Sequence, residues 1–495
     1  MSRVAVQSIV EDQDLLDTPA AGVVAIRGGA YRMAGYVLGV AVSVGSSALL
    51  LRHLGVVDTG SYVTVLSLVT LAGGVTDWGL GAVGVRELST LPADGSRRFF
   101  RGLSGLRLLF ALGACACACA FSFLSGYSST LIVGTLLAGA GFVLASLQST
   151  YSLPLLVSLR LGWVTAVELL RQAGTAVVVV ALVLAGAPLL LFWAATIPAG
   201  VAAVVVAAIL IRRSTPLLPA FDGSLWRALV WRTLPYSVAS AVGIIYFRLA
   251  ILIMSHVAGG QQTGYFAASF RIIEVLFIAP QLIVGSMLPI FARAARDDSA
   301  RFDYALGRTF DVCLLLGLAT GLALVTGAHS IVGIVAGQRF GPAAPVLRVQ
   351  GLALIATFVG AVLGYGLLSL ERYRILLWTN LTVLLLSGVL TGVLGSRYGA
   401  LGAAVATAIV EALYTAMLAV AVLRSGARPQ VSIGRAPRAA LAAALGALAL
   451  LPPGVPDLLR PVLAIAIYCA GLLALGAVPS ELLEQIPRPW QLRHS

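Results

Sequence analysis

A single arginine interrupts an otherwise apolar stretch of the chain, "IIYFRLAILI" at residues 244–253. A charged side chain at the centre of a membrane-spanning helix costs about 2.5–3.5 kcal/mol on insertion scales, so Arg248 needs a compensating interaction. Ser237 precedes it by 11 residues and Ser255 follows it by 7. At about 100° per residue, the three side chains fall within about 20° of one another on a helix. Because a guanidinium can bind phosphate through two parallel hydrogen bonds, Arg248, Ser237 and Ser255 are candidate substrate-binding residues.

Other ionisable residues also lie within apolar segments. Arg271 and Glu274 are three residues apart, as are Glu168 and Arg171, and this spacing brings side chains together on a helix. Both are most simply internal ion pairs. Glu411 has no partner at helical spacing. Arg271, Glu274 and Glu411 join the candidate binding set, with a structural role as the alternative for each.

A stripe of small residues marks one earlier segment. Its members share one helical face and would let a second helix approach closely; they are Thr70, Gly73, Gly74, Asp77 and Gly81. Asp77, near the inner end of this stripe, is the last candidate binding residue. Its structural alternative is to hold a neighbouring helix or arginine in place.

The composition requires a membrane protein. Hydrophobic residues make up 59% of the chain and charged residues 11%, and the mean hydropathy is +0.98, whereas a soluble domain is about a quarter charged. All 33 basic residues are arginines, so a phosphate-binding loop that needs lysine is excluded. The five cysteines have no spacing that favours a metal site. Asp12-Gln13-Asp14 matches the D-x-D pattern of a sugar-nucleotide metal site but is more simply part of a solvated tail. We therefore expect no metal, no cofactor and no catalytic residue.

Runs of about 20 apolar residues predict an all-α polytopic fold with about 14 transmembrane helices. They lie at 29–51, 60–82, 104–124, 130–152, 163–185, 189–211, 234–257, 264–290, 309–328, 346–370, 375–395, 399–423, 438–452 and 460–478. Most arginines fall in alternate connecting segments, which places both termini in the cytoplasm by the positive-inside rule. The same distribution argues against a nucleic-acid partner, because the arginines do not form one basic face.

A short repeat divides the chain. "DTGSY" at 58–62 and "QQTGYF" at 261–266 each open a span with Thr-Gly and a tyrosine, as expected for two related lobes. The predicted organisation is a cytoplasmic N-terminal tail, an N-lobe of spans 1–6, an inter-lobe loop, a C-lobe of spans 7–12, two extra spans and a cytoplasmic C-terminal tail. The respective boundaries are 1–24, 25–211, 212–233, 234–423, 424–478 and 479–495. Within the loop, "SLWRALVWRTL" has the pattern of an amphipathic helix at a membrane surface.

Four motifs, in order, resemble a known family. "RHLGVVDTGSYVTVLSLVTLAGGVTDWGLGAVGVREL" (52–88) resembles the opening of polysaccharide and O-antigen flippases of the multidrug/oligosaccharidyl-lipid/polysaccharide exporter superfamily. "GYFAASFRIIEVLFIAP" (264–280) is similar to the opening of that family's second lobe, and "GQRFGPAAPVLRV" (337–349) and "YGALGAAVATAIVEAL" (398–413) resemble further signatures. The resemblance covers roughly residues 25–425. Ala250 departs from it, since the family often has Asp at that position, so no role of that carboxylate carries over.

The resemblance implies a flippase of the cytoplasmic membrane rather than an enzyme. It would move a polyprenyl-diphosphate-linked oligosaccharide from the inner to the outer leaflet for surface polysaccharide synthesis, with membrane lipids and possible polymerase and glycosyltransferase partners. A cation-coupled multidrug antiporter of the same superfamily is the alternative, although residues 29–51 lack the carboxylate expected in its first span. A membrane-embedded polymerase or glycosyltransferase is a weaker alternative, because the outer loop near 329–345 offers only His329 and Arg339.

Overall fold

The described part of this computed structural model is built from helices, with no strand. It comprises residues 21–77, 79–213, 215–432, 434–450 and 455–478, with side chains from residue 38 onward except at 75–77, 82, 93, 235–240 and 450. The predicted terminal tails therefore lie almost entirely outside the described residues. By contacts the chain divides into two compact units, an N-terminal unit of residues 1–54 and 61–248 and a C-terminal unit of residues 55–60 and 249–495. The predicted lobe boundaries remain a prediction; by contacts, the division falls inside a helix.

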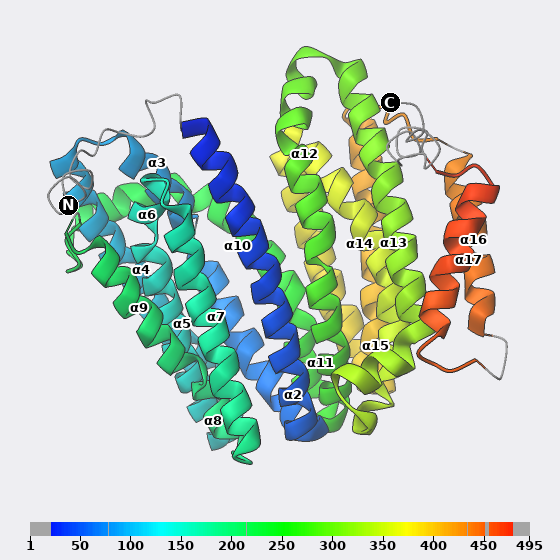
Figure 1. Ribbon diagram of the computed structural model, residues 1–495, viewed down its shortest axis with the longest axis horizontal. Coiled ribbons are helices and arrows are strands. Elements are labelled where there is room, and N and C mark those ends of the chain that lie inside the picture. The colour runs from blue at the N-terminus through cyan, green and yellow to red at the C-terminus, as the bar shows by residue number, and fades with distance from the viewer. Residues whose placement is uncertain (1–20, 78, 214, 433, 451–454, 479–495) are drawn as a thin grey trace, which may run out of the picture. The chain divides into compact units, whose positions relative to one another are not determined.

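The N-terminal unit is a bundle in which α5 packs against both α4 and α9, and α9 against α7 (Figure 1). Its helices are α2 (Ala21–Asp77), α3 (Leu80–Thr90), α4 (Ala93–Leu124), α5 (Ser129–Tyr151), α6 (Leu153–Val157), α7 (Leu161–Leu184), α8 (Leu189–Ala194), α9 (Thr196–Ile211) and α10 (Gly223–Val257). The last of these passes into the C-terminal unit after Arg248.

The C-terminal unit is built around α14, which packs between α13 and α15. Its helices are α11 (Gly259–Leu276), α12 (Ile278–Asp297), α13 (Ser299–Val335), α14 (Ala343–Ser369), α15 (Tyr373–Arg424), α16 (Arg435–Ala447) and α17 (Arg460–Ala474). In Figure 1, α16 and α17 lie side by side, and both contact α13.

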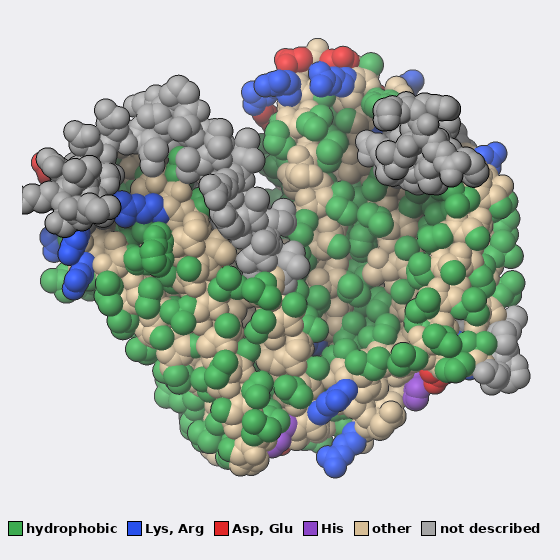
Figure 2. All heavy atoms as spheres, in the orientation of Figure 1, with side chains coloured by type: hydrophobic (Ala, Val, Ile, Leu, Met, Phe, Trp, Pro, Cys, Tyr) green, Lys and Arg blue, Asp and Glu red, His purple; other side chains and the backbone are tan. Residues whose placement is uncertain are grey.

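The predicted polytopic helical fold is confirmed. Within the described residues, nine helices are long and apolar enough to cross a membrane, and Ala241–Val257 and Arg460–Ala474 are shorter apolar helices. Together these cover thirteen of the predicted spans, while span 13 corresponds to the short α16. Hydrophobic side chains cover the middles of the helices and most visible arginines lie near helix ends (Figure 2).

Two glycines separate spans that the backbone otherwise continues as one helix. Gly55 (φ 74°) breaks α2 between spans 1 and 2, and Gly399 (φ 58°) breaks α15 between spans 11 and 12. Only glycine adopts such backbone angles readily, so the two reversals are fixed by sequence. The predicted end of span 2 was wrong, because α2 ends at Asp77 and Gly79 precedes a new helix. Gly81 therefore lies on α3, apart from the stripe on α2.

The two copies of the Thr-Gly repeat contact each other. A Cβ atom on Gly60 would lie 2.9 Å from the Gly264 nitrogen, and one on Gly264 would lie 2.0 Å from the Val56 oxygen. Both residues belong to the C-terminal unit. Backbone therefore packs directly on backbone here, which explains why glycine follows threonine in both copies.

A strap of irregular backbone, residues 212–213 and 215–222, connects α9 to α10. The Asp222 carboxylate caps α10 by accepting hydrogen bonds from the Leu225 amide (3.1 Å) and the Ser224 hydroxyl (2.6 Å). These two bonds, and then the Arg98 guanidinium at 3.5 Å, hold the pKa of the Asp222 carboxyl below its usual value of 3.8. A lowered pKa in the folded state means that protonation weakens the cap.

We expect Asp222→Ala to lower the thermal unfolding midpoint at neutral pH, because a helix cap is lost. The stabilisation by this carboxylate is present above its ordinary pKa of 3.8 and is lost as the pH falls through the lower, folded-state pKa. The difference in midpoint between wild type and variant should therefore shrink on acidification below about pH 4. A difference that stays constant down to pH 3 would show that the cap does not depend on the charge.

Candidate functional site

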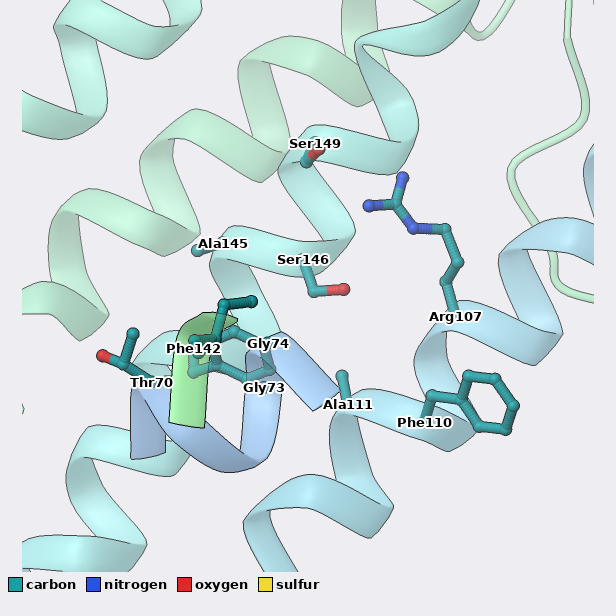
Figure 3. Close-up of a pocket in the computed structure, with 11 residues that line it drawn as sticks. Thr70, Gly73, Gly74, Arg107, Phe110, Ala111, Phe142, Ala145, Ser146 and Ser149 are labelled. Atoms are coloured by element: carbon teal, nitrogen blue, oxygen red, sulfur yellow. The ribbon is translucent and has the colours of Figure 1, made fainter. Parts of the chain in front are cut away.

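A cavity of about 330 Å³ lies inside the N-terminal unit. It is bounded by α2, α4, α5 and α10, whose lining residues are Thr70, Gly73 and Gly74; Arg107, Phe110 and Ala111; Phe142, Ala145, Ser146 and Ser149; and Ile244. In Figure 3 the Arg107 side chain extends from α4 toward the part of α5 that carries Ser146 and Ser149. Arg107 is the charged residue among these lining residues, and the polar ones carry hydroxyls.

The small residues of α2 bring the walls of this cavity together. A Cβ atom on Gly73 would lie 2.2 Å from the Phe142 ring, and one on Gly74 would lie 2.6 Å from the Ile244 side chain. Glycine at these positions therefore lets α5 and α10 approach α2 closely, as the stripe predicted. Of the other members of the stripe, Thr70 lines the cavity, while the Asp77 side chain lies outside the described residues.

Arg107 is the main residue that sequence reasoning missed. It stands near the start of the predicted span 104–124, where an arginine ordinarily faces the membrane surface. The helix in fact begins at Ala93, so Arg107 lies about 21 Å along α4 at 1.5 Å per residue. Its side chain is buried, with 6% of the residue exposed. A buried cation is costly unless polar groups surround it, and the cavity supplies hydroxyls from two helices. A signal for this position was present, because Arg107 falls inside the predicted span 104–124.

Arg248 lies one turn beyond this cavity along α10. Ile244, which lines the cavity, precedes it by four residues and therefore stands on the same face of the helix. Arg248 is half-buried, and its Cζ atom lies 5.5 Å from the ring centroid of Phe247. Arg248 therefore lies about 6 Å along the axis of α10 from Ile244, the residue of this helix that lines the cavity.

The two serines predicted to flank Arg248 differ in what the structure shows. The Ser237 side chain lies outside the described residues. Ser255 belongs to the C-terminal unit, and its hydroxyl donates to the Leu252 carbonyl oxygen at 2.7 Å. This bond to its own helix accounts for the hydroxyl without a ligand. The predicted binding role of these serines remains a prediction.

Both expected ion pairs at three-residue spacing are present. On α11, the Arg271 Nη1 atom lies 2.7 Å from Glu274 Oε2, and both side chains are partly buried. On α7, Arg171 pairs with Glu168, which also accepts a hydrogen bond from Gln172 at 2.7 Å. Each pair neutralises its charges within one helix, as the spacing predicted.

Glu411 finds its partner on another helix. Its carboxylate is buried within the C-terminal unit and accepts a hydrogen bond from the Thr357 hydroxyl on α14 at 2.9 Å. Thr415, one turn further along α15, donates to the Ala356 carbonyl oxygen at 2.9 Å. These two bonds join α14 to α15, so Glu411 has a structural role in helix packing whatever else it does.

A second buried charge, Asp311 on α13, also escaped sequence reasoning. Asp311 lies 2.8 Å from Arg435 on α16, and its side chain is 3% exposed. Arg308 approaches the same carboxylate at 3.9 Å. The pair attaches α16 to α13 across 124 residues of sequence. The three-residue spacing of Arg308 was a signal for Asp311, but helical spacing reveals partners within one helix only, so the Arg435 partner could not be found.

The apolar helices define a multi-pass membrane protein. Its N-terminal unit contains a cavity bordered by the buried Arg107. No known protein family matches the sequence, and no curated protein matches it. Solved structures do match over most of the chain. An inward closed structure of the lipid II flippase MurJ is 13% identical, with a TM-score of 0.74 over 92% of this chain and 99% of that one.

Two further structures show the same architecture. An inward-facing transporter of the multidrug resistance MATE family of the MOP superfamily is 12% identical, with a TM-score of 0.62 over 79% of this chain and 96% of that one. A MOP superfamily transporter from Pyrococcus furiosus is 13% identical, with a TM-score of 0.57 over 82% and 96%. At these identities the likeness establishes the fold: the chain has the fold of the MOP superfamily, as its sequence motifs led us to expect.

We expect the Arg271–Glu274 pair to stabilise the C-terminal unit. Arg271→Ala or Glu274→Ala alone strands a partly buried charge and should cost on the order of 3 kcal/mol. Replacing both by leucine should cost less than either single change. Thermal unfolding in detergent measures this, with Glu371→Ala as the control because its pair with Arg296 is exposed (3.4 Å). Additive losses in the double variant would show that the two side chains do not interact energetically.

Proposed function

We propose that the protein is a flippase that moves a polyprenyl-diphosphate-linked oligosaccharide from the inner to the outer leaflet of the cytoplasmic membrane. The observation that carries this proposal is the buried Arg107 in a hydroxyl-lined cavity within the fold of the MOP superfamily. A guanidinium in a site of low water content binds phosphate oxygens strongly and retains its charge at any physiological pH. The hydroxyls of Thr70, Ser146 and Ser149 add donors suited to phosphate or sugar oxygens.

The remaining predicted residues fit the same proposal. Arg248, one turn along α10 from the cavity wall, would bind the same diphosphate, and Ser237, Ser255 and Asp77 stay candidate binding residues. Arg271, Glu274 and Glu411 would contribute mainly by holding their helices in place. Both termini would be cytoplasmic, and glycosyltransferases and a polymerase would act before and after the transfer.

The multidrug antiporter is less well supported. Cation-coupled members of the superfamily would be expected to carry a carboxylate in span 1, and residues 29–51 contain none. The described lining of the cavity carries an arginine rather than an acid, which disfavours a cationic drug. A polymerase or glycosyltransferase is less well supported, because the outer loop near 329–345 offers only His329, which is exposed, and Arg339.

Arg107→Gln should reduce transport about tenfold to a hundredfold, since a charge-assisted hydrogen bond of about 1.5–3 kcal/mol is lost. Flipping of a fluorescent lipid-diphosphate oligosaccharide in proteoliposomes, at matched protein level, is the measurement. The same vesicles with a cationic dye test the antiporter alternative. Arg397→Gln is the control, because Arg397 is an exposed arginine outside the N-terminal unit. Normal flipping by Arg107→Gln, or dye transport without lipid flipping, would contradict the proposal.

Arg248 gives a separate prediction, because its side chain is half-buried rather than buried. Arg248→Ala should insert normally, since an insertion cost is removed, and should lose transport. Arg248→Lys should keep the charge and still lose much of the activity, because a point charge does not reproduce two parallel hydrogen bonds. The same flipping assay applies. If Arg248→Ala flips lipid at the wild-type rate, Arg248 is a structural residue.

A further inference from the structure

The strap, residues 212–213 and 215–222, is fixed to the surface of the N-terminal unit. The Ala220 amide donates to the Arg101 carbonyl oxygen at 2.9 Å, and Arg101 Nε donates to the Leu218 carbonyl oxygen at 3.2 Å. The Tyr151 hydroxyl donates to the Leu217 carbonyl oxygen at 3.2 Å. A Cβ atom on Gly105 would lie 2.5 Å from the Ala220 oxygen, so the strap packs directly on α4.

The first turns of α10 continue this fixed surface. The Trp226 indole nitrogen donates to the Gly102 carbonyl oxygen at 2.8 Å, and Arg232 pairs with Glu87 on α3 at 2.7 Å. In Figure 1 these turns of α10 (green) run across the ends of neighbouring helices, as expected for the amphipathic stretch in the sequence.

Two large apolar side chains nevertheless point away from this well-bonded strap. Leu218 is 75% exposed and Phe221 is 79% exposed. Leu217, the residue before Leu218, packs instead against the core of the unit. The Phe221 ring meets Trp226 edge-on, with 5.4 Å between ring centroids. The strap backbone is held by hydrogen bonds on both sides, which fixes where these side chains leave it. Their outward position indicates an apolar partner.

Arginines surround these two side chains. Those with exposed side chains on α4, the strap and the first turns of α10 are Arg97, Arg98, Arg101, Arg212, Arg213, Arg227 and Arg232. The acids nearby are fewer: Asp222 pairs with Arg98, Glu87 pairs with Arg232, and Asp94 is exposed at the start of α4. The surface therefore carries a clear positive excess, which complements an anionic partner.

The position of the strap favours a bilayer over a soluble protein as that partner. Its first residue directly follows Ile211, where the apolar helix segment Leu189–Ile211 ends. It packs on Gly105, where the predicted span of α4 begins. The strap therefore lies at the level of the headgroups, where aromatic and basic side chains gather. Apolar tips among arginines are the pattern of a helix or loop that lies in the membrane interface.

We propose that the strap and the first turns of α10 form a binding surface for anionic phospholipids of the bilayer. Leu218 and Phe221 enter the boundary between headgroups and acyl chains, and the surrounding arginines bind lipid phosphates. This surface is distinct from the Arg107 cavity, and it does not depend on what the protein transports.

The test uses the full chain in nanodiscs, with its five native cysteines replaced by alanine and a fluorophore on Phe221→Cys. Phosphatidylglycerol or phosphatidylcholine carrying a quencher near the headgroup is added in turn. We expect strong quenching, and more by phosphatidylglycerol than by phosphatidylcholine. The ratio should fall toward one as arginines are removed, because their contacts with anionic headgroups cause the preference for phosphatidylglycerol.

The test variant combines Arg97→Gln, Arg213→Gln and Arg227→Gln. The hydrogen bonds described above that hold the strap do not involve these three side chains. The matched control combines Arg339→Gln, Arg348→Gln and Arg397→Gln, three exposed arginines of the C-terminal unit, and should leave the ratio unchanged. A label at Glu371→Cys reports a polar exposed position and should be quenched little. Quenching at position 221 no stronger than at 371, or equal quenching by both lipids, would overturn the proposal. The proposal would also be overturned if the fluorophore at position 221 were shielded from solvent only after cytosolic protein is added.

Discussion

The absence of water from the bilayer interior governs the rest of this structure. Backbone groups without water must bond within their own segment, which accounts for a described chain of helices without strands. The same condition applies to every charge inside a span. Arg271–Glu274 and Glu168–Arg171 satisfy it within one helix, whereas Glu411 and Asp311 satisfy it across helices. The second group does more for the fold, because each member fixes the position of a neighbouring helix.

Close packing in the absence of a hydrophobic driving force relies on small residues. Gly73 and Gly74 let α2 approach α5 and α10, and Gly60 meets Gly264 where the two repeats touch. The first contact shapes the cavity and the second joins the starts of two spans. A β-carbon at any of these positions would force backbone or side-chain atoms apart. Glycine at these positions is therefore a consequence of close helix packing.

Sequence patterns predicted what depends on local spacing and failed where partners come from elsewhere. Apolar runs located the spans, and three-residue spacing located both ion pairs. The end of span 2 was misplaced because Gly79, in the left-handed conformation, precedes a new helix although the apolar pattern continues. Arg107 and Asp311 were missed for a different reason. Each stands near the end of an apolar run, where a charge is ordinarily at the surface, and only the longer helix and the neighbouring helices show that it is buried.

This distinction separates charges that can bind a ligand from charges that hold the fold. Asp311 is enclosed by arginines of two helices and has little surface left, so no ligand can reach it. Arg107 is as deeply buried, yet its guanidinium borders an open volume lined by hydroxyls rather than a packed joint. An anion can approach a charge beside an open volume, whereas it cannot approach a charge in a packed joint. Arg98 and its exposed neighbours are the opposite case, because they lie at the surface and can meet only an extended charged surface. The surroundings of each arginine therefore decide which of the proposed tasks it could perform.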